Sequence, residues 1–330
     1  MGPAIAEIQP LHPFLACLVN PFLHQSVLLN EVVHHLAPKP EKRYLDATVG
    51  GAGHAAAILE ASAPTGWLFA CDRDGAAIDA AARRLAPFAG RFELRHMAFD
   101  QVDQWIEPES CDGVLADLGL SSPMVDRPER GFSFLLDGPL DMRMDCRQTL
   151  TAADVIRDAP VGELIRIFGR LGGEPRARAI ARAVDSERRR APLETTGQLA
   201  RLVERIHPRR GSRAHPATRV FLGLRLHVND ELAQLDRGLP ALWSCVAPGG
   251  RLAIITFHSL EDRQVKQFGN ARARSYTCPG ALDIPELRQP RSPDLRWVSR
   301  RPIRPSPEEL AANPRSRSAQ LRVMEKCHAS

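Results

Sequence analysis

The chain has 330 residues, of which 44% are hydrophobic and 25% are charged, and its formal net charge is +5. This composition is typical of a soluble globular protein with one large or two ordinary domains. No apolar run approaches the roughly 18 residues that a membrane-spanning helix needs, so we expect no membrane anchor.

The N-terminal residues and the cysteines indicate the compartment. Residues 10–23 are apolar but contain three prolines and lack a basic flank, which fits neither a signal peptide nor an anchor. We expect residues 1–23 to form a flexible extension. The seven cysteines are scattered and form no Cys-x-x-Cys pair, which argues against a disulfide framework and a zinc knuckle. We therefore expect a cytoplasmic protein, where thiols stay reduced.

Charged side chains are unevenly distributed along the chain. Residues 1–120 carry 8 basic and 15 acidic side chains, residues 121–235 carry 20 and 15, and residues 236–330 carry 16 and 9. Between residues 170 and 225 there are 14 arginines and 5 acidic residues. An acidic first part followed by a basic remainder indicates a polyanionic partner such as nucleic acid. The alternative is that the arginines cover solvated helix surfaces.

The first 120 residues alternate between strand and helix patterns. The run 67–71 is continuously apolar and ends at Asp72, as in a strand that is buried on both faces. The predicted strands are 43–48, 67–71, 92–96 and 112–117, and the predicted helices are 25–36, 53–61 and 75–85. This alternation predicts an α/β fold with a doubly wound, Rossmann-like parallel sheet.

The pattern changes after the fourth predicted strand. Residues 118–138 are irregular, and residues 151–235 are helical, with Thr195 and Gln198 placed as a capping box and Pro216 at a helix first turn. Strand character returns at 251–257 and again at 320–326. We therefore predict an all-helical domain at 125–235, inserted into an α/β domain that comprises residues 24–124 and 236–330.

The run 45–54 reads as a strand that ends at Asp46, a turn with three glycines and a helix start. Glycines let a ligand approach the backbone, and the helix start offers unpaired N–H groups. Asp72 follows Gly53 by 19 residues and is placed to accept hydrogen bonds from ribose hydroxyls. A dinucleotide fold shares these features, but the strict Gly-x-Gly-x-x-Gly spacing is absent. Asp46 favours an S-adenosylmethionine-dependent methyltransferase, in which it holds the cofactor's amino group or orders the turn.

The fourth predicted strand ends at Asp117, which is followed by a sharp turn and Pro123. Ligands of open α/β sheets bind at this carboxyl edge. Asp117 is therefore a candidate to accept a hydrogen bond from a target amine or to grip the cofactor, with a helix cap or ion pair as the structural alternative. His258, after the fifth predicted strand, is a second candidate proton acceptor, with helix capping as its alternative.

Two further motifs have open roles. Phe132 and Phe134, beside Arg130, are candidates for a stacking wall against an unstacked base, and core packing is the alternative. Arg143 lies between carboxylates in the run 141–145, which favours a structural role over a phosphate contact.

Taken together, the motifs resemble those of the bacterial small-subunit ribosomal RNA cytosine-N4 methyltransferases, the RsmH or MraW family. The resemblance extends from residue 24 to residue 326. The acidic-Met-Arg run at 141–145 and the Phe-His-Ser-Leu-Glu-Asp-Arg run at 257–263 are rare combinations. The matching stretches are 24–29, 46–54, 72–74, 117–123, 129–134, 137–145, 215–219, 257–263 and 313–319.

The resemblance implies methyl transfer from S-adenosyl-L-methionine to N4 of one cytidine in the decoding centre (P site) of 16S ribosomal RNA. The implied partner is small-subunit RNA, which we expect within the assembled subunit, with a homodimer left open. The implied cofactor-binding residues are Ala52, Gly53, His54, Asp72, Phe99, Asp117 and Met124, with no metal; Asp117 and His258 are the catalytic candidates.

Two implied positions depart from the family pattern. Ala52 stands where the family generally has Gly, which is tolerable if its φ is negative. Met124 stands where the family often has Gln, so that only an apolar or backbone contact with the cofactor can remain.

Two other function classes stay open. A nucleotide-dependent oxidoreductase is disfavoured by the missing glycine spacing and by the Asp117 loop. A non-catalytic RNA-binding ribosome-assembly factor on the same fold would bind small subunits without incorporating methyl groups.

Overall fold

The computed structural model describes residues 26–209, 215–279 and 283–328, so the predicted N-terminal extension lies outside the described residues. Its main sheet has the strand order β3-β2-β1-β4-β5-β9-β8. Strands β1 to β5 pair in parallel, and β9 runs antiparallel to β5 and β8. The strands of this sheet are β1 (Arg43–Asp46), β2 (Trp67–Asp72), β3 (Phe92–His96), β4 (Cys111–Asp117), β5 (Val246–Thr256), β8 (Leu295–Trp297) and β9 (Gln320–Lys326).

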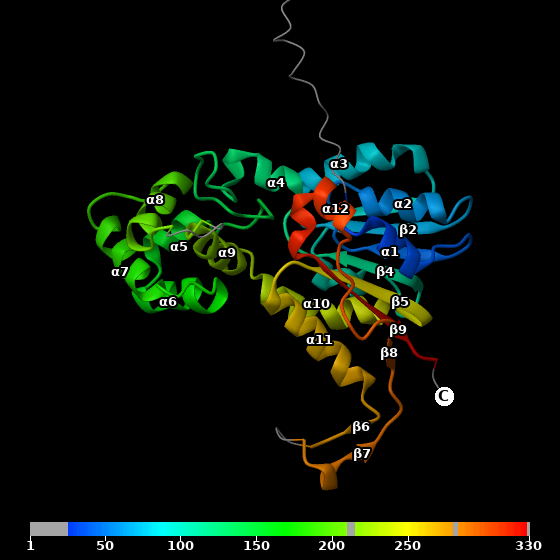
Figure 1. The fold of residues 1–330 in the computed structure, drawn as a ribbon. Coiled ribbons are helices and arrows are strands. Elements are labelled where there is room, and N and C mark those ends of the chain that lie inside the picture. Colours follow the sequence, from blue (N-terminus) through cyan, green and yellow to red (C-terminus); the bar gives the residue numbers. More distant parts are fainter. Residues whose placement is uncertain (1–25, 210–214, 280–282, 329–330) are drawn as a thin grey trace, which may run out of the picture.

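Helices cover both faces of this sheet (Figure 1). The helices that pack on it or follow its strands are α1 (Leu29–Leu36), α2 (Gly53–Ala61), α3 (Gly75–Leu85), α10 (Glu231–Cys245) and α11 (Ser259–Ala273). Helices α1 to α3 lie on one face and α10 and α11 on the other, and each group buries its own hydrophobic core. The predicted doubly wound α/β fold is therefore confirmed.

A third hydrophobic core belongs to a helical region beside the sheet. Its helices are α5 (Ala152–Asp158), α6 (Val161–Ile165), α7 (Ala177–Arg188), α8 (Thr196–Ile206) and α9 (Ala217–Val228). The predicted capping box of Thr195 and Gln198 is present at α8. Pro216 stands at the N-cap of α9. Leu235, the last residue of the predicted helical insert, packs in the core of the sheet. The bounds of the insert, 125–235, stay a prediction.

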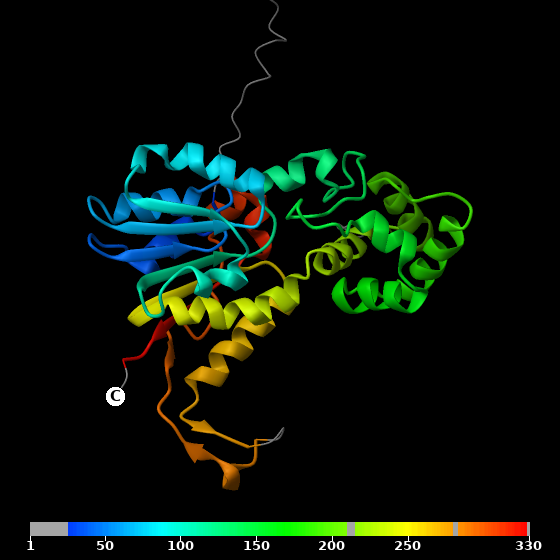
Figure 2. The ribbon, with the colours of Figure 1, turned by 180° about the vertical axis from the view of Figure 1, so that it is seen from behind.

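The C-terminal quarter contains more structure than its sequence indicates. Helix α11 has Glu261, Val265 and Gly269 as its buried residues, so it carries no apolar stripe. Figure 2 shows a two-stranded arm that projects from the end of α11, formed by β6 (Tyr276–Thr277) and β7 (Gln289–Pro290). The short helices α4 (Ser122–Asp126) and α12 (Pro307–Ala312) also occupy segments that the sequence presents as irregular.

The strand order reverses between β1 and β4. In open α/β sheets this reversal leaves a crevice at the carboxyl ends of the strands, and ligands bind there. Among the described residues, no helix is long and apolar enough to cross a membrane.

Candidate functional site

The turn between β1 and α2 is tied to both neighbouring strands. Asp46 Oδ1 accepts a hydrogen bond from the Thr48 N–H at 3.3 Å. The Thr48 hydroxyl accepts one from the Asp117 N–H at 2.6 Å, and Asp72 Oδ2 accepts one from the Gly50 N–H at 2.9 Å. Asp46 is 1% exposed and is not part of the cavity wall described below. Of the two roles predicted for Asp46, the structure therefore shows the ordering of the turn.

Ala52 corrects an expectation from the sequence. Its φ is +57°, in the left-handed region, and not negative. The Ala52 N–H donates to the Val49 carbonyl at 2.7 Å and its carbonyl accepts from the Ala56 N–H at 3.0 Å, so the turn and the first turn of α2 together impose this conformation. It costs an L-residue about 1–2 kcal/mol. The Ala52 side chain is fully buried and lies outside the cavity wall, so Ala52 shapes the turn without lining the site.

A cavity of about 350 Å³ opens at this edge of the sheet. Pockets for small molecules span about 300–1,000 Å³. The other six predicted cofactor-binding residues line it: Gly53, His54, Asp72, Phe99, Asp117 and Met124.

Several further residues of the cavity wall were not singled out from the sequence. They come from the end of β2, from α10, from the junction of β5 and α11, and from the C-terminal segment: Arg73, Glu231, Gln234, Phe257, Glu261 and Arg315. Glu261 and Arg315 belong to two of the motifs that carry the family resemblance, which is the signal that marked them. Only the tertiary structure brings them to the cavity.

Asp117 carries the site's unpartnered carboxylate oxygen. Among the described residues, its Oδ1 is buried and has no hydrogen-bond partner, while its Oδ2 lies 3.8 Å from Nδ1 of His54. Burial raises the pKa of Asp117 well above its usual range, and the charges of Asp46 and Glu261 add to this effect. A buried polar atom without a partner is costly. Because Asp117 belongs to the cavity wall, its Oδ1 marks a place for a ligand's donor.

His54 is held by the segment that precedes α1. Its Nε2 lies 2.9 Å from the Val27 carbonyl oxygen. Because a carbonyl only accepts, Nε2 carries a proton and donates it to this bond. The other ring nitrogen, Nδ1, is the one on the side of Asp117.

Two more buried carboxyl groups lie at the same edge of the sheet. Burial raises the pKa of Asp46 to about 7 and that of Asp72 to about 6, although backbone N–H groups oppose the shift at both residues. Both carboxyl groups therefore hold their protons more tightly than an exposed aspartate does. Among residues 26–209, 215–279 and 283–328, no group of three or more His, Cys, Asp or Glu side chains is arranged to hold a metal ion.

His258 is the N-cap of α11. Its Nδ1 accepts a hydrogen bond from the Glu261 N–H at 3.4 Å, and its Nε2 lies 3.0 Å from Glu261 Oε1. Glu261 Oε2 in turn accepts from the Phe257 N–H at 2.9 Å. Glu261 lines the cavity, whereas His258 is not part of its wall. Of the two roles predicted for His258, the structure therefore shows the helix cap, and the role as a proton acceptor stays a prediction.

The pKa of Glu261 is shifted in the direction opposite to that of Asp117. Burial alone would raise its pKa, but the hydrogen bond and charge of His258, the charge of Arg225 and the Phe257 N–H outweigh burial and hold the pKa below its ordinary value. The pKa values of the two cavity carboxyl groups are therefore shifted in opposite directions, an arrangement typical of acid–base sites.

Apolar side chains complete the wall. Phe99 is 7% exposed and begins a short 3₁₀-helix, Phe99–Gln104, against α10. Met124 is 4% exposed and also belongs to the core of the helical region. Its thioether offers a ligand apolar contact and only a weak acceptor.

The aromatic residues after α4 pack inward. Phe132 is buried in the core of the helical region, and the ring of Phe134 lies 4.8 Å from the rings of Phe221 and His215, centre to centre. Neither phenylalanine is part of the cavity wall. The structure therefore shows core packing, and the stacking wall proposed from the sequence is not at this cavity.

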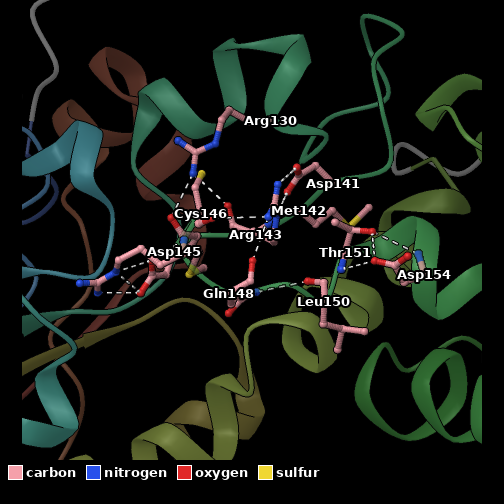
Figure 3. A network of polar contacts seen from close by, with 12 residues as sticks. Arg130, Asp141, Met142, Arg143, Asp145, Cys146, Gln148, Leu150, Thr151 and Asp154 are labelled. Atoms are coloured by element: carbon pink, nitrogen blue, oxygen red, sulfur yellow. Dashed lines mark hydrogen bonds and ion pairs between the residues drawn. The ribbon is translucent and has the colours of Figure 1, made fainter.

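Arg130 and Arg143 lie in a polar network between the helical region and the sheet (Figure 3). Arg143 makes a two-pronged contact with Asp141 at 2.9 and 2.7 Å and donates to the Gln148 carbonyl at 2.8 Å, as expected for a structural arginine. Arg130 donates to Asp74 Oδ2 at 3.1 Å and to the Arg143 carbonyl at 2.9 Å. Because Asp74 caps α3, Arg130 connects this network to the α/β core.

Comparison with known proteins gives a consistent result. A family model described as the MraW methylase family matches residues 21–327. A protein of Thermomicrobium roseum is 48% identical over 307 residues, which cover 92% of this chain and 93% of the relative. One of Syntrophotalea carbinolica is 47% identical over 308 residues, which cover 92% and 98%. Both relatives are named ribosomal RNA small subunit methyltransferase H.

Solved structures resemble the chain much more weakly. A putative rRNA methylase from Clostridium thermocellum aligns with a TM-score of 0.44 at 11% identity, and the alignment covers 92% of this chain and 98% of that one. The family assignment therefore depends on the sequence matches.

Proposed function

The chain belongs to the MraW methylase family, and from this we propose that it transfers a methyl group from S-adenosyl-L-methionine to N4 of a cytidine in the decoding centre of 16S ribosomal RNA. The curated relatives support small-subunit ribosomal RNA as the substrate, because nearly the whole length of each is covered. The choice of N4 and of one P-site cytidine is our proposal. We propose the cytoplasm as its location, because ribosomal subunits are assembled there.

The residues at the cavity fit a cationic nucleoside cofactor. The glycine turn gives open backbone, Asp72 in the wall is proposed to accept hydrogen bonds from ribose hydroxyls, and Phe99 and Met124 give an apolar wall. The Glu261 carboxylate in the wall, whose pKa is held below its ordinary value, suits the positive sulfonium. We propose that Gly53, His54, Asp72, Phe99, Asp117 and Met124 hold S-adenosyl-L-methionine, which when bound supplies a methyl group on an already activated sulfur.

Asp117 is the proposed catalytic residue. The lone pair of the cytosine N4 is delocalised into the ring, so an acceptor for an N4–H bond would localise the lone pair and take up the proton that N4 loses as its bond to carbon forms. The unpartnered Oδ1 of Asp117 is such an acceptor, and it is the observation that carries this proposal. The raised pKa of Asp117 makes its carboxylate a stronger base than an exposed aspartate. The remaining rate enhancement comes from alignment of the two reactants.

His258 acts in this proposal as a positioning residue. It holds Glu261 through the cap of α11, and Glu261 lines the cavity. We propose this indirect role in place of proton transfer by the His258 ring.

The basic helical insert is proposed to grip the RNA. A base within folded RNA must be unstacked to reach a sheet edge, and phosphate contacts offset part of that cost. The arginines between residues 170 and 225 supply such contacts, which makes a large ribonucleoprotein such as the assembled small subunit a suitable substrate.

Labelled methyl transfer tests the proposal. Small subunits and free 16S RNA from a strain that lacks this gene are incubated with the enzyme and labelled S-adenosyl-L-methionine, and the modified nucleoside is identified by mass spectrometry. We expect N4-methylcytidine at a single position, with subunits preferred over free RNA. D117N should bind the cofactor but transfer about 10²-fold more slowly or worse. Binding of subunits without any methyl incorporation would instead support the assembly-factor alternative, and tight NAD binding would support the oxidoreductase.

A further inference from the structure

The cavity wall carries charged side chains of both signs. Among the described residues, four carboxyl side chains line it: Asp72, Asp117, Glu231 and Glu261. Two guanidinium groups, those of Arg73 and Arg315, stand against them. Glu231 is already paired with Arg225, whose Nε and Nη2 donate to it at 2.8 and 2.9 Å. An RNA strand that brings a base to the cavity carries phosphates, and an available guanidinium group in the wall is a suitable partner for one of them.

The guanidinium group of Arg73 forms hydrogen bonds inside the protein. Its Nη1 donates to the Asn229 carbonyl at 3.0 Å and to Gln234 Oε1 at 2.8 Å, both of them in or next to α10. These neutral acceptors fix the guanidinium between β2 and α10. Arg73 therefore stabilises the wall and has little freedom to meet a strand from outside.

Arg315 has a different setting. Its side chain is 45% exposed, and in the described chain its ion-pair partner is Asp126 at the end of α4, which is 43% exposed. Nη1 of Arg315 donates to Asp126 Oδ2 at 3.3 Å. An exposed pair of this kind contributes about 0–1 kcal/mol. Asp126 is therefore easily replaced by a phosphate, which accepts two parallel bonds from the same guanidinium fork.

The loop that carries Arg315 is firmly anchored. Its neighbour Ser316 is fully buried, and the Ser316 hydroxyl donates to the Asn313 carbonyl at 2.8 Å. Just before the loop, α12 is fastened to the start of α1, because Glu309 Oε1 accepts the Leu28 N–H at 2.8 Å. Figure 1 shows α12 between α4 and the helices of the α/β domain. Arg315 is thus presented at the cavity from a rigid support.

We infer that Arg315 binds a backbone phosphate of the RNA strand next to the cytidine held in the cavity, and that Asp126 holds the guanidinium in place until RNA arrives. This inference rests on the proposed function, since it assumes that a nucleotide of an RNA strand enters the cavity. It makes Arg315 a positioning residue for the acceptor.

Steady-state kinetics on small subunits test the inference with four variants. R315A should raise the KM for subunits about tenfold, because it removes one charge-assisted hydrogen-bond contact with phosphate. It should leave the dissociation constant of S-adenosyl-L-methionine unchanged. The slope of log affinity against log salt should fall in size by about 0.7, as expected for one lost phosphate contact to a single strand. R315K should recover part of the KM. R317A, on the same loop but outside the cavity wall, should change KM less than R315A does.

The D126N variant distinguishes two roles of the Arg315–Asp126 pair: release of Arg315 to bind RNA, and attachment of the C-terminal loop to α4. If Arg315 exchanges Asp126 for phosphate, D126N removes the competitor, and the KM for subunits falls or stays the same. If the pair only fastens the C-terminal loop to α4, D126N and R315A raise the KM alike, and the inference is overturned. An unchanged salt slope in R315A, or a weakened cofactor affinity, overturns it as well. Failure of the proposed function looks different, because the wild-type protein would then transfer no methyl group.

Discussion

Phe99 lies directly against Gly238 of α10, and a β-carbon at Gly238 would stand 2.1 Å from the Phe99 ring. The glycine thereby determines where a cavity-lining aromatic ring sits.

G238A should therefore displace Phe99 and weaken cofactor binding. Overpacking of this kind costs about 1–3 kcal/mol, which corresponds to about a tenfold or larger rise in the dissociation constant if the strain is relieved when the ring leaves the cavity wall. Calorimetric titration with S-adenosyl-L-methionine measures the effect. G162A is the matched control, because a β-carbon at Gly162 in α6 would meet nothing within 4 Å. Equal affinities of the two variants would contradict this account of Phe99.

Asp46 should make stability depend on pH between about 4 and 7. An unfolded Asp ionises near 3.9, whereas the folded-state pKa is about 7, so the folded protein binds the proton more tightly. Its contribution to stability is fully present below about pH 4 and is lost as the pH rises toward 7, by up to ~4 kcal/mol. Urea denaturation of wild type and D46N at pH 5, 6 and 7 should give a difference that changes in favour of D46N as the pH rises. A constant difference would show that Asp46 is ionised throughout.

R130A should destabilise the chain by about 3–5 kcal/mol. The variant leaves the buried Asp74 carboxylate without its charged partner and frees the Arg143 carbonyl, and breaking a buried pair has a cost of this size. R127A, at an exposed position three residues earlier, should stay within about 0.5 kcal/mol of wild type. Chemical denaturation compares the two directly, and similar losses in both variants would rule out the buried pair as the cause.

H258N distinguishes helix capping from proton transfer. Asparagine is among the best N-cap residues, so H258N should keep α11 and Glu261 in place and keep kcat near the wild-type value. Loss of a general base would instead lower kcat by about 10²–10⁴-fold. H258A should reduce stability by about 1 kcal/mol through the lost cap. A pH–rate profile that is unchanged in H258N would complete the assignment.

Ala52 should tolerate glycine but not valine. In A52G the relief of a positive φ and the loss of a buried methyl group roughly cancel, so stability should change by less than about 1 kcal/mol. Valine is β-branched and is disfavoured at φ +57°, so A52V should lose at least about 2 kcal/mol and weaken cofactor binding through the distorted turn. Thermal denaturation with and without the cofactor tests both, and a stable A52V would show that the turn can relax.

The sequence by itself determined the α/β architecture and those cavity residues that follow the strands of the sheet. Strand patterns that end at Asp46, Asp72 and Asp117 predicted parallel strands whose carboxyl ends meet at one edge, because a right-handed strand–helix–strand connection brings successive strands back in the same direction. The glycine turn and the motifs at 141–145 and 257–263 then pointed to a methyltransferase. These signals are local, since each depends on residues within one strand or turn.

Only the tertiary structure decided what surrounds that edge. Glu231, Glu261 and Arg315 come from segments far along the chain, and nothing in their local sequence states which cavity they line. His258 is a cap because α11 begins there. Ala52 has a positive φ because its backbone is hydrogen-bonded both to the turn and to the first turn of α2. Burial, pairing and backbone conformation at these positions depend on contacts between distant segments. The sequence thus predicted that the turn after β1 binds the methyl donor. The folded chain showed that Arg315 lines the same cavity.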